Sequence, residues 1–581
     1  MSYGHSQSND KAQKVVVPEL AGRRRFILAC FMLVMCALIY RAIDLQVLNN
    51  SYLQKRGEAV HLRDIKLPAY RGKITDASGH ALAISAPVSS VWVNPQELSL
   101  EGKKKELATL LGFNVKALDR KLKKVASRRF VYLRRHMDPQ VASKIDDLQL
   151  PGVYLQKEYR RYYPDGEVAA HLVGFTNIDD EGQEGLELAF NEQLKGIAGA
   201  ERVLRDGKRR VVKHVDNIRA PISGQDIQLS IDRRLQYLAY RELKAAVAQQ
   251  NAMSGSLVLL NPKTGEVLAV ANQPAFNPND RSKFKASHVR NRAFVDVFEP
   301  GSTMKPFTVA AGMESGVFDT STIIDTNPGY MKVGRSQVRD HRNYGAIDLA
   351  TLLLKSSNVA SAKIALGIPP EGLWGMLSGL GFGRTADLGF PGEARGKLVG
   401  YEQWRPIETA TLSFGYGLSA SALQLAHAYA AIANDGLLEP VSLVLDKQLP
   451  ESVRVMDASV ASSVREMLKG VVSKTGTAPR AKVHGYSVAG KTGTVKKAIA
   501  GGYSEDKYLG IFAGMAPAND PKLVMVVVID EPKAGDYYGG LVAAPVFSRV
   551  MSGALRLMNI APDDIENTAA TVLASVERGK P

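Results

Sequence analysis

The chain has 581 residues and a mass of 63.0 kDa. This exceeds the roughly 250 to 300 residues at which a single core stops growing, so we expect more than one domain. Its 45% hydrophobic and 23% charged residues exclude a disordered or fibrous protein, and its two cysteines exclude a disulfide-stapled fold.

The net charge of +16 favours anionic partners. The densest basic run, residues 116–135, has no nucleic-acid motif beside it. We interpret it as a solvated helical face and expect no nucleic-acid partner.

An apolar segment near the N-terminus predicts a membrane anchor. Residues Phe26–Tyr40 contain no charge, and the apolar character continues past Arg41 to Leu48. At about 1.5 Å per residue the uncharged run covers only some 22 Å of the roughly 30 Å hydrocarbon core. Extension to Leu45 closes the gap if Arg41 reaches outward. We therefore predict a transmembrane helix at residues 26–48.

The flanking residues predict how this helix is oriented. Arg23–Arg25 precede the apolar run, and the positive-inside rule keeps residues 1–25 in the cytoplasm as a tail. No small-residue cleavage site follows Tyr40, which favours an uncleaved anchor over a signal peptide. We predict a single-pass membrane protein whose residues after the span are exported. Cys30 and Cys36 both lie in the span, so the exported part has no cysteine, as suits an oxidising compartment.

Residues 49–223 form a mixed α and β region without obvious chemistry. Short strand-like runs alternate there with basic helical stretches and turns. The acidic cluster Asp179, Asp180 and Glu181 matches no calcium-loop spacing, so we expect a solvated loop rather than a metal site. We expect neither a metal nor a cofactor in this protein.

From residue 224 onward the pattern predicts a sheet covered by helices. Ile227–Ile231 is typical of a strand, and Asp232 is expected to cap the helix after it. Five further strand-like runs follow, with helical stretches at 420–434 and 460–472 between the second and the third; the runs are 254–260, 266–272, 486–494, 508–515 and 523–529. This order implies an α/β chain of the α+β type with a mainly antiparallel five-stranded sheet. Residues 561–581 are typical of a polar tail.

Ser302 and Lys305 are a candidate nucleophile and base. Pro300 and Gly301 predict a turn, and a helical apolar pattern begins directly after it. Ser302 is therefore expected at a helix start, where unpaired N–H groups and the positive end of the dipole favour an oxyanion. Lys305 lies one turn further on the same face, and a lysine buried enough to lose its proton can activate a hydroxyl. On this pair alone, an N-cap serine followed by a surface lysine is the stronger interpretation.

Two further motifs reverse that interpretation. Ser356-x-Asn358 follows in the chain, and Lys491-Thr492-Gly493-Thr494 continues an apolar-alternating run. The motifs Ser-x-x-Lys, Ser-x-Asn and Lys-Thr-Gly in that order are the signature of penicillin-recognising enzymes. The order and the context together make this signal specific.

Lys-Thr-Gly occurs three times, so one copy has to be chosen. The copy at Lys263 lies in a hairpin turn and precedes Ser302, which breaks the order. The copy at Lys474–Thr477 follows a helical stretch and is followed by Pro479, which a central strand does not tolerate. We predict a loop there and assign the motif to Lys491.

Acyl transfer then gives each residue a role. Ser302 attacks a carbonyl, Lys305 is the general base, and backbone N–H groups of Ser302 and of the strand edge hold the tetrahedral oxygen. Ser356 relays a proton to the departing amine between Lys305 and Lys491, and Asn358 binds a substrate amide. The strand edge receives the terminal carboxylate of the substrate; its residues are Lys491, Thr492, Gly493 and Thr494. The sequence leaves open which group removes the serine proton.

These motifs and the single span resemble the class B penicillin-binding proteins, in particular the peptidoglycan D,D-transpeptidases of Gram-negative cell division. The resemblance runs through nearly the whole chain, and its further motifs are Arg71–Asp76, Arg161–Glu167, Ala170-His171, Glu184–Glu187, Asn291–Ala293, Phe298–Ser302, Phe414–Gly417 and Tyr537–Gly540. It implies an elongated pedestal, or dimerisation, domain at residues 49–223 and a transpeptidase domain at residues 224–560. Tyr503, Tyr537 and Tyr538 match the aromatic wall that this family has beside its site.

The resemblance also implies a substrate, inhibitors and partners. The substrate would be the pentapeptide stem of peptidoglycan, and the product a 4→3 cross-link made in septal cell-wall synthesis. β-Lactams would acylate the same serine. A lipid II polymerase of the division machinery and other divisome membrane proteins would be partners. A D,D-carboxypeptidase, a β-lactamase and a non-catalytic divisome scaffold or β-lactam sensor are alternatives that keep the same motifs.

Overall fold

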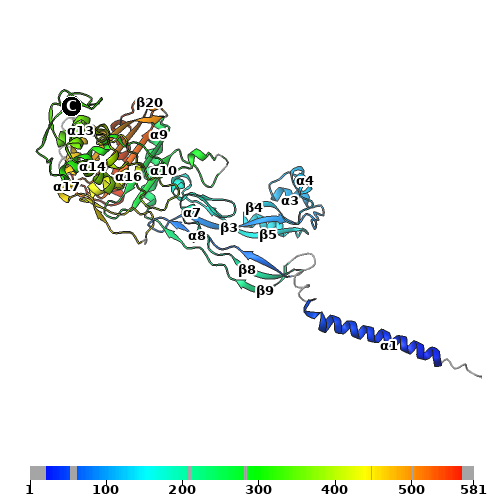
Figure 1. The fold of residues 1–581 in the computed structure, drawn as a ribbon. Coiled ribbons are helices and arrows are strands. Elements are labelled where there is room, and N and C mark those ends of the chain that lie inside the picture. Colours follow the sequence, from blue (N-terminus) through cyan, green and yellow to red (C-terminus); the bar gives the residue numbers. More distant parts are fainter. Residues whose placement is uncertain are drawn as a thin grey trace, which may run out of the picture. The chain divides into compact units, whose positions relative to one another are not determined.

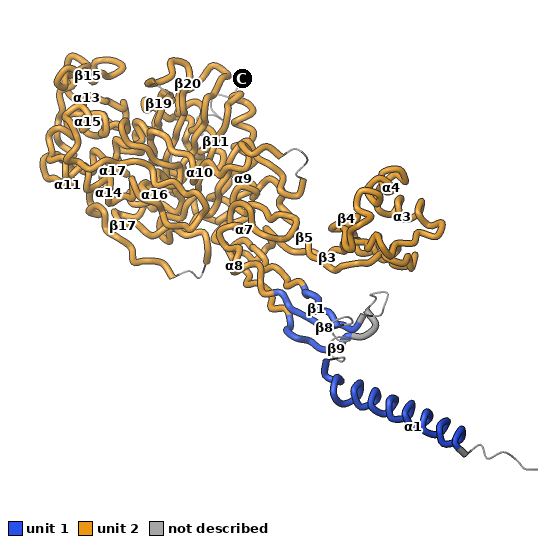
Figure 2. The backbone as a smooth tube through the Cα atoms, turned by 45° about the vertical axis from the view of Figure 1, so that its right-hand side comes forward, with its two compact units in different colours: residues 1–67, 198–220 blue, residues 68–197, 221–581 orange. Residues whose placement is uncertain are grey.

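The computed structural model describes residues 21–52, 62–205, 211–280, 282, 284–445, 448–499 and 501–564. The chain forms two compact units, one of residues 1–67 and 198–220 and the other of residues 68–197 and 221–581 (Figure 2). The predicted cytoplasmic tail up to residue 20, and the predicted C-terminal tail from residue 565, lie outside the described residues.

The apolar N-terminal segment forms one long helix (Figure 1). Helix α1, Ala21–Ile43, continues into a π-helical turn, η1, Asp44–Leu48. The apolar stretch Gly22–Leu48 has 27 residues, or about 40 Å of helix, which is enough to cross a bilayer. Arg41 Nη1 donates to Asp44 Oδ2 at 2.5 Å. The charge of Arg41 is therefore paired with a carboxylate about one turn further along the helix.

The first unit also holds a small antiparallel sheet in the order β1-β8-β9. Its strands are β1, Leu62–Leu67, β8, Gly199–Arg205, and β9, Val211–Arg219. Asp64 on β1 and Arg202 on β8 are partners in the register and form an ion pair at 2.9 Å. Both side chains are exposed, so this pair contributes little to stability.

Residues 68–197 of the second unit, together with the short strand β10, Ile227–Gln228, form a sheet with helices on one face. The strand order is β10-β2-β3-β4, and β5 pairs with β3 as well. The elements are β2, Ile74–Thr75, β3, Ala81–Val93, α3, Lys104–Leu110, α4, Val115–Lys124, β4, Val131–Met137, α5, Pro139–Asp146, and β5, Val153–Tyr162. Leu107, Leu118 and Ile145 of the three helices pack on Val91 and Val93 of β3.

The basic run at residues 116–135 is only partly the solvated helix that the sequence predicted. In α4 only Leu118 is buried, and the basic side chains of this helix are exposed except for the half-buried Lys121, which donates to Leu133 O. Residues 131–135 belong instead to strand β4. Val131 and Leu133 alternate with polar residues at the strand period of two, a signal that our interpretation of the whole basic run as one helical face overlooked.

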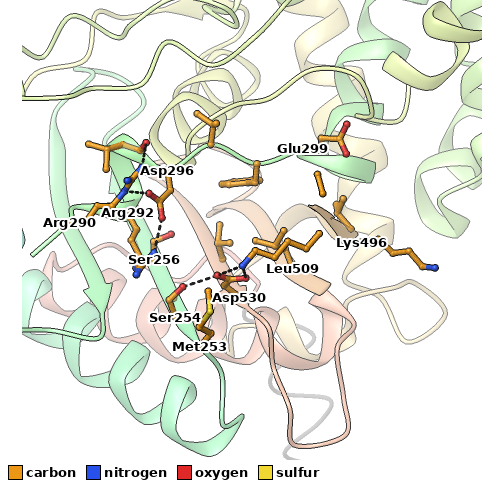
Figure 3. Close-up of a pocket in the computed structure, with 18 residues that line it drawn as sticks. Met253, Ser254, Ser256, Arg290, Arg292, Asp296, Glu299, Lys496, Leu509 and Asp530 are labelled. Atoms are coloured by element: carbon orange, nitrogen blue, oxygen red, sulfur yellow. Dashed lines mark hydrogen bonds and ion pairs between the residues drawn. The ribbon is translucent and has the colours of Figure 1, made fainter. Parts of the chain in front are cut away.

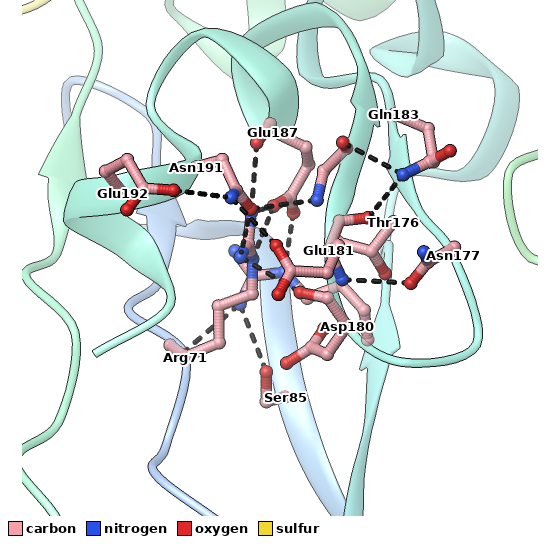
Figure 4. Close-up of polar contacts among 12 residues, drawn as sticks. Arg71, Ser85, Thr176, Asn177, Asp180, Glu181, Gln183, Glu187, Asn191 and Glu192 are labelled. Atoms are coloured by element: carbon pink, nitrogen blue, oxygen red, sulfur yellow. Dashed lines mark hydrogen bonds and ion pairs between the residues drawn. The ribbon is translucent and has the colours of Figure 1, made fainter. Parts of the chain in front are cut away.

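Three motifs far apart in the sequence meet in a buried ion cluster (Figure 4). Glu187 is fully buried and accepts from Arg71 Nε at 2.7 Å and from Arg161 Nε at 2.6 Å. Arg71 also donates to the backbone carbonyls of Asp180 and Glu187. Asp180 is half-buried, and burial raises its pKa to about 6, so the predicted solvated loop at 179–181 is wrong for this residue. Removal of Glu187 would leave two buried guanidinium groups without their carboxylate, which is strongly destabilising.

Residues 221–564 are built on one antiparallel sheet in the order β12-β11-β21-β20-β19. Its strands are β11, Ser254–Leu260, β12, Val267–Gln273, β19, Ala489–Ile499, β20, Gly502–Ala516, and β21, Leu523–Asp530. Every neighbouring pair in it is antiparallel. The predicted five-stranded antiparallel sheet is confirmed.

Helices cover both faces of this sheet. A Cβ at Gly255 would meet Leu243 and Val247 of α9, Arg233–Gln249. The next residue, Ser256, instead lines a cavity with Arg292 of α10, Arg292–Val295. Because successive strand residues point to opposite faces, α9 and α10 lie on opposite sides. Helix α19, Ala544–Leu557, packs beside α9, and α16, Ala422–Ala433, packs beside α10.

Two predicted strands have different bounds in the structure. The strand expected at 227–231 is only β10, Ile227–Gln228, because the residues after it bond to the segment around Leu443. Strand β19 begins at Ala489 rather than 486, because Tyr486 N closes a turn onto Val483 O at 3.2 Å. The predicted cap is confirmed, since the Asp232 side chain accepts from the backbone of α9.

The remaining helices and strands lie between the strands of the larger sheets or after the last of them. Before residue 221 they are 3-10 turn η2, Gly166–Val168, α6, Ala170–Val173, β6, Phe175–Thr176, β7, Gly182–Glu184, α7, Gly185–Ala189, and α8, Asn191–Leu194. Between β12 and β19 they are α11, Lys305–Glu314, β13, Ile323–Asp325, β14, Tyr330–Val333, β15, Ser336–Arg339, β16, Ala346–Asp348, α12, Leu349–Lys355, α13, Asn358–Gly367, α14, Pro370–Gly379, α15, Pro406–Leu412, β17, Leu437–Leu438, β18, Val453–Arg454, and α17, Ala458–Val471. After β21 comes α18, Gly539–Val542.

Candidate active site

The candidate nucleophile Ser302 lies in a tight turn that leads into a helix. Residues Gly301–Met304 form a 3-10 turn, and α11 follows with Pro306 in its first turn. Gly301 has a φ of +58°, and its N–H donates to Gly415 O at 3.1 Å. Glycine adopts this φ without strain. Ser302 therefore stands at a helix start, as predicted, although the first turn is a 3-10 turn.

The candidate base Lys305 is fully buried, and its amine has three oxygen partners. Nζ lies 2.5 Å from Ser356 O, 2.8 Å from Asn358 Oδ1 and 3.1 Å from Ser356 Oγ. Burial, and then the charge of Lys491, hold the pKa of Lys305 well below its usual value, while Asp340 opposes them. The two carbonyl oxygens only accept, so Ser356 Oγ is the partner that can donate to the lone pair of a neutral amine.

Ser302 and Lys305, the candidate nucleophile and base, make no direct hydrogen bond with each other in the described part of the chain. Lys305 Nζ bonds to the Ser356–Asn358 segment, and Ser302 Oγ makes no hydrogen bond within the described part of the chain. The reason is that three oxygen atoms of that segment compete for the amine. Catalytic hydrogen bonds of this kind tighten in many enzymes only when substrate binds.

The loop that carries Ser356 and Asn358 joins two helices. Ser356 ends α12 in the left-handed conformation, with a φ of +59°. Ser357 caps α13 by accepting from Ala360 N at 3.0 Å. A serine in this conformation costs on the order of 1–2 kcal/mol. The loop must therefore be held by its neighbours.

Asp340, which reasoning from the sequence missed, holds this loop. Its Oδ1 accepts from Asn358 N at 2.5 Å and from Val359 N at 3.1 Å, and its Oδ2 accepts from Ser357 Oγ at 2.6 Å. The carboxylate satisfies backbone donors at the start of α13 and is favoured by the helix dipole. Asp340 follows β15 and lies 18 residues before Asn358, so no local pattern marks it.

The Lys-Thr-Gly-Thr string of β19 approaches the Ser302 turn closely. A Cβ at Gly493 would lie 2.9 Å from Pro300 O and 3.1 Å from Thr303 Cγ2. A residue without a side chain is therefore required where the strand meets the turn. Thr494 Oγ1 accepts from Gly539 N at 3.0 Å, which ties the end of the string to α18.

Lys491 is buried in this strand beside Thr492. Its Nζ lies 3.4 Å from Thr492 O and 3.5 Å from Thr492 Oγ1. Burial lowers the pKa of Lys491 to about 7. The charge of Lys491 acts on Lys305 strongly enough to lower the pKa of Lys305, so the two lysines belong to one site.

The three tyrosines of the predicted aromatic wall lie in two groups. Tyr503 OH donates to Glu299 Oε1 at 3.1 Å, and its ring meets Tyr416 edge to face at 5.8 Å. Tyr537 and Tyr538 stack on each other with ring centroids 4.5 Å apart. Tyr503 and Tyr538 are each 45% exposed. Glu299, three residues before the nucleophile, is a neighbour whose contact with Tyr503 the sequence did not predict.

A separate cavity of about 350 Å³ lies beside the turn (Figure 3). It is enclosed by the strand ends around Ser254, Lys497 and Asp530 and by the segment from Arg290 to Glu299. Asp530 binds Ser254 Oγ at 3.0 Å and Lys497 Nζ at 3.0 Å. The predicted catalytic side chains do not line this cavity.

The order of the three motifs, and their meeting at one strand edge of an antiparallel sheet, are those of penicillin-recognising serine enzymes. The family model for the penicillin binding protein transpeptidase domain matches residues 255–552, and the one for the penicillin-binding protein dimerisation domain matches residues 66–229. The chain belongs to the penicillin-binding protein transpeptidases. Our predicted domain at 224–560 is wider than its match, whereas the match to the domain predicted at 49–223 begins later and ends later, at residue 229. The bounds of both domains stay predictions.

Relatives and solved structures agree with this family. The chain is 42% identical over 549 residues to the probable peptidoglycan D,D-transpeptidase PbpC of Pseudomonas aeruginosa, covering 94% of this chain and 97% of that protein. It is 41% identical over 551 residues to the peptidoglycan D,D-transpeptidase FtsI of Escherichia coli, covering 94% and 93%.

Among solved structures, the transpeptidase domain of Burkholderia pseudomallei penicillin-binding protein 3 is 42% identical with a TM-score of 0.53, covering 58% of this chain and 97% of that one. A peptidoglycan synthetase of Bifidobacterium adolescentis is 25% identical with a TM-score of 0.70, covering 86% and 98%.

Proposed function

We propose that this chain is a peptidoglycan D,D-transpeptidase that makes 4→3 cross-links through an acyl-enzyme on Ser302. The observation that carries the proposal is the position of Lys305 Nζ, within hydrogen-bond distance of both Ser356 and Asn358. The pKa of Lys305 is lowered by burial and by the charge of Lys491. An amine whose pKa is held well below its usual value, beside a serine at a helix start, suits general-base catalysis of acyl transfer. The names of the relatives support the same reaction.

In the acylation step, Ser302 Oγ attacks the carbonyl carbon of the penultimate D-alanine. The new C–O bond forms as the proton of the hydroxyl passes to Lys305, and the C–N bond to the terminal D-alanine then breaks. Ser356, which bonds to Lys305 Nζ, passes a proton to the departing amine. The N–H groups of Ser302 and Thr494 hold the oxyanion, because β19 is an edge strand with N–H groups that the sheet does not use.

The other groups of the strand edge bind the end of the donor stem. Lys491 and the hydroxyls of Thr492 and Thr494 receive the terminal carboxylate, close to Gly493, and Asn358 binds an amide of the stem. An amine of a neighbouring stem then attacks the ester and forms the new C–N bond. The ester C–O bond to Ser302 breaks, and a proton from the amine returns to Ser302 Oγ. A β-lactam, which mimics the stem, acylates Ser302 and stays there. Tyr503, Tyr537 and Tyr538 form the wall beside the bound peptide.

The cellular setting is part of the same proposal. The single apolar helix near the N-terminus, with the arginines before it, supports an inner-membrane anchor with the N-terminus in the cytoplasm and the catalytic domain in the periplasm. The similarity to FtsI of Escherichia coli supports septal synthesis, with a lipid II polymerase and other divisome membrane proteins as partners.

Labelling of the full-length chain with a fluorescent penicillin tests the assignment of the nucleophile. The wild type should be labelled, and Ser302→Ala should lose the label completely because no oxygen remains to form the ester. Ser336→Ala, on the exposed hairpin strand β15, is the matched control and should label like the wild type. Label retained by Ser302→Ala would exclude Ser302 as the nucleophile.

A second measurement separates transfer from hydrolysis. The chain is given a D-alanyl thioester and an added D-amino acid, and the products are separated. A transpeptidase joins the acyl group to the added amine, whereas a carboxypeptidase or a β-lactamase releases it to water. A non-catalytic scaffold would turn over neither substrate.

A further inference from the structure

The second Lys-Thr-Gly-Thr string, at residues 474–477, has no role in the mechanism above. It forms the predicted loop after α17. Ala478 N donates to Val471 O at 2.9 Å, and a Cβ at Gly476 would lie 2.2 Å from Val471 O. The loop is therefore closed tightly onto the end of α17, and this closure fixes the position of Thr477.

This loop contacts three elements that carry or flank predicted site residues. Lys355 Nζ, at the end of α12, donates to Thr475 O at 2.9 Å. Thr477 Oγ1 lies 3.0 Å from Thr492 Oγ1 of β19. A Cβ at Gly540, in α18, would lie 2.2 Å from Thr477 O. The loop thus connects the helix before the Ser-x-Asn loop with the strand edge assigned to the carboxylate.

The pair of threonine hydroxyls has a consequence for carboxylate binding. A hydroxyl donates one proton and accepts up to two. Thr492 Oγ1 lies between Thr477 Oγ1 at 3.0 Å and Lys491 Nζ at 3.5 Å. If Thr492 donated to Thr477, it would have no proton left for a carboxylate. If Thr477 donates to Thr492, the Thr492 proton is available, and the two aligned hydroxyls strengthen each other.

We propose that Thr477 is a positioning residue for the carboxylate end of the substrate. Its hydroxyl donates to Thr492 Oγ1 and so directs the Thr492 proton toward the carboxylate beside Lys491. This inference rests on the proposed function, because it takes the donor stem to end in a carboxylate at this edge. Thr475 is in the same loop, but its hydroxyl lies 3.2 Å from Ser473 Oγ instead, and it has no such role.

The test compares two substrates on the full-length chain in detergent. One is a D-alanyl thioester that ends in a free carboxylate, and the other is its methyl ester. Thr477→Val keeps the shape of the side chain but removes the hydroxyl. We expect it to lower kcat/KM for the carboxylate substrate roughly three- to tenfold, mainly through KM, and to leave the methyl ester nearly unaffected. Thr477→Ser should restore the wild-type value, and Thr475→Val should match the wild type.

Two results would overturn the inference. One is an equal loss with both substrates, which would indicate a merely structural role for Thr477. The other is wild-type kinetics in Thr477→Val. Penicillin labelling of the same preparations keeps the two proposals apart. If the wild type does not react, the proposed function itself fails, whereas a reactive wild type with an unaltered Thr477→Val excludes only the positioning role.

Discussion

For this site to work, one of its two buried lysines must be neutral and the other must be positively charged. Lys305 has to be neutral to accept the serine proton, and Lys491 has to be charged to attract a carboxylate. Both are fully buried, and the charge of Lys491 is a cause of the lowered pKa of Lys305. The charge on Lys491 therefore favours the neutral form of Lys305, because two buried groups that lie close together resist both carrying a positive charge.

We expect a bell-shaped pH dependence of kcat/KM for acylation. The rate rises with pH as Lys305 loses its proton, and this limb lies well below the usual pKa of lysine. The rate falls again as pH rises through about 7, because the free enzyme then loses the charge on Lys491. Bound carboxylate stabilises that charge, so kcat alone should fall at higher pH than kcat/KM. Steady-state turnover of a D-alanyl thioester that ends in a carboxylate, measured over a pH series, gives both.

An arginine variant is the control for this assignment. Lys491→Arg keeps its charge at every accessible pH, so its descending limb should disappear even if its rate is lower overall. A wild-type profile that stays flat from about pH 6 to 9 would contradict the two-lysine scheme.

Among the secondary-structure elements, the start of α13 sets the geometry of the site. Asn358 is the first residue of this helix, and Ser356 precedes it in a strained left-handed conformation. Asp340 accepts from the backbone of Asn358 and from the hydroxyl of Ser357. The Asp340 carboxylate thus holds the segment that carries both groups bound to the amine of Lys305, by bonds to Ser357 and Asn358.

We expect Asp340→Ala to slow penicillin acylation roughly tenfold, because a lost helix cap of about 1–2 kcal/mol releases the strained loop. Asp340→Asn keeps one acceptor oxygen and should lie between the alanine variant and the wild type. The rate constant of acylation and the melting temperature are measured together.

Asp232→Ala is the matched control for the cap. Asp232 caps α9 by accepting from Arg234 N at 2.8 Å, on the opposite side of the sheet from α10. This variant should lower the melting temperature without slowing acylation. Equal acylation rates in Asp340→Ala and Asp232→Ala would refute a role for Asp340 in holding the loop.

For the whole molecule, the second unit joins the N-terminal α+β part to the transpeptidase part. Asn279 Nδ2 donates to Tyr163 O at 2.8 Å, and Asn279 Oδ1 accepts from Tyr163 N at 3.0 Å. Arg233 at the start of α9 pairs with Asp165 at 2.6 Å. Tyr163 and Asp165 belong to the motif Arg161–Glu167 of the N-terminal α+β part. One role of this motif is therefore to hold the N-terminal α+β part and the transpeptidase part together.

The topology of the chain can be tested with single cysteines, because the native Cys30 and Cys36 both lie in α1. We expect Ser336→Cys, on the exposed strand β15, to react with a membrane-impermeant maleimide in spheroplasts. Ser8→Cys should react only after the membrane is permeabilised, since the arginines keep the N-terminus inside. The wild type is the blank for both. Labelling of Ser8→Cys in intact spheroplasts would contradict the proposed orientation.

Much of this fold could be predicted because its signals are local. Short apolar or alternating runs between turns marked the five strands of the main sheet, and Asp232 marked the start of α9. The order of Ser302, Ser356 and Lys491 indicated the class of chemistry before any geometry was known. The predicted elements were wrong where one local pattern is compatible with two structures, as at residues 131–135. They were also wrong where a turn, such as that at Tyr486, shortens a strand.

The sequence by itself determined the kind of enzyme, its motif residues, its apolar N-terminal helix and the antiparallel sheet, because periodicity, caps and motif spacing act over a few residues. Only the tertiary structure decided which side chains meet. It put Lys305 on Ser356 rather than on Ser302, Asp340 under the Ser-x-Asn loop, and Thr477 on Thr492. The reason is physical: such contacts join residues that are far apart along the chain, and packing of the intervening helices and strands fixes their distances.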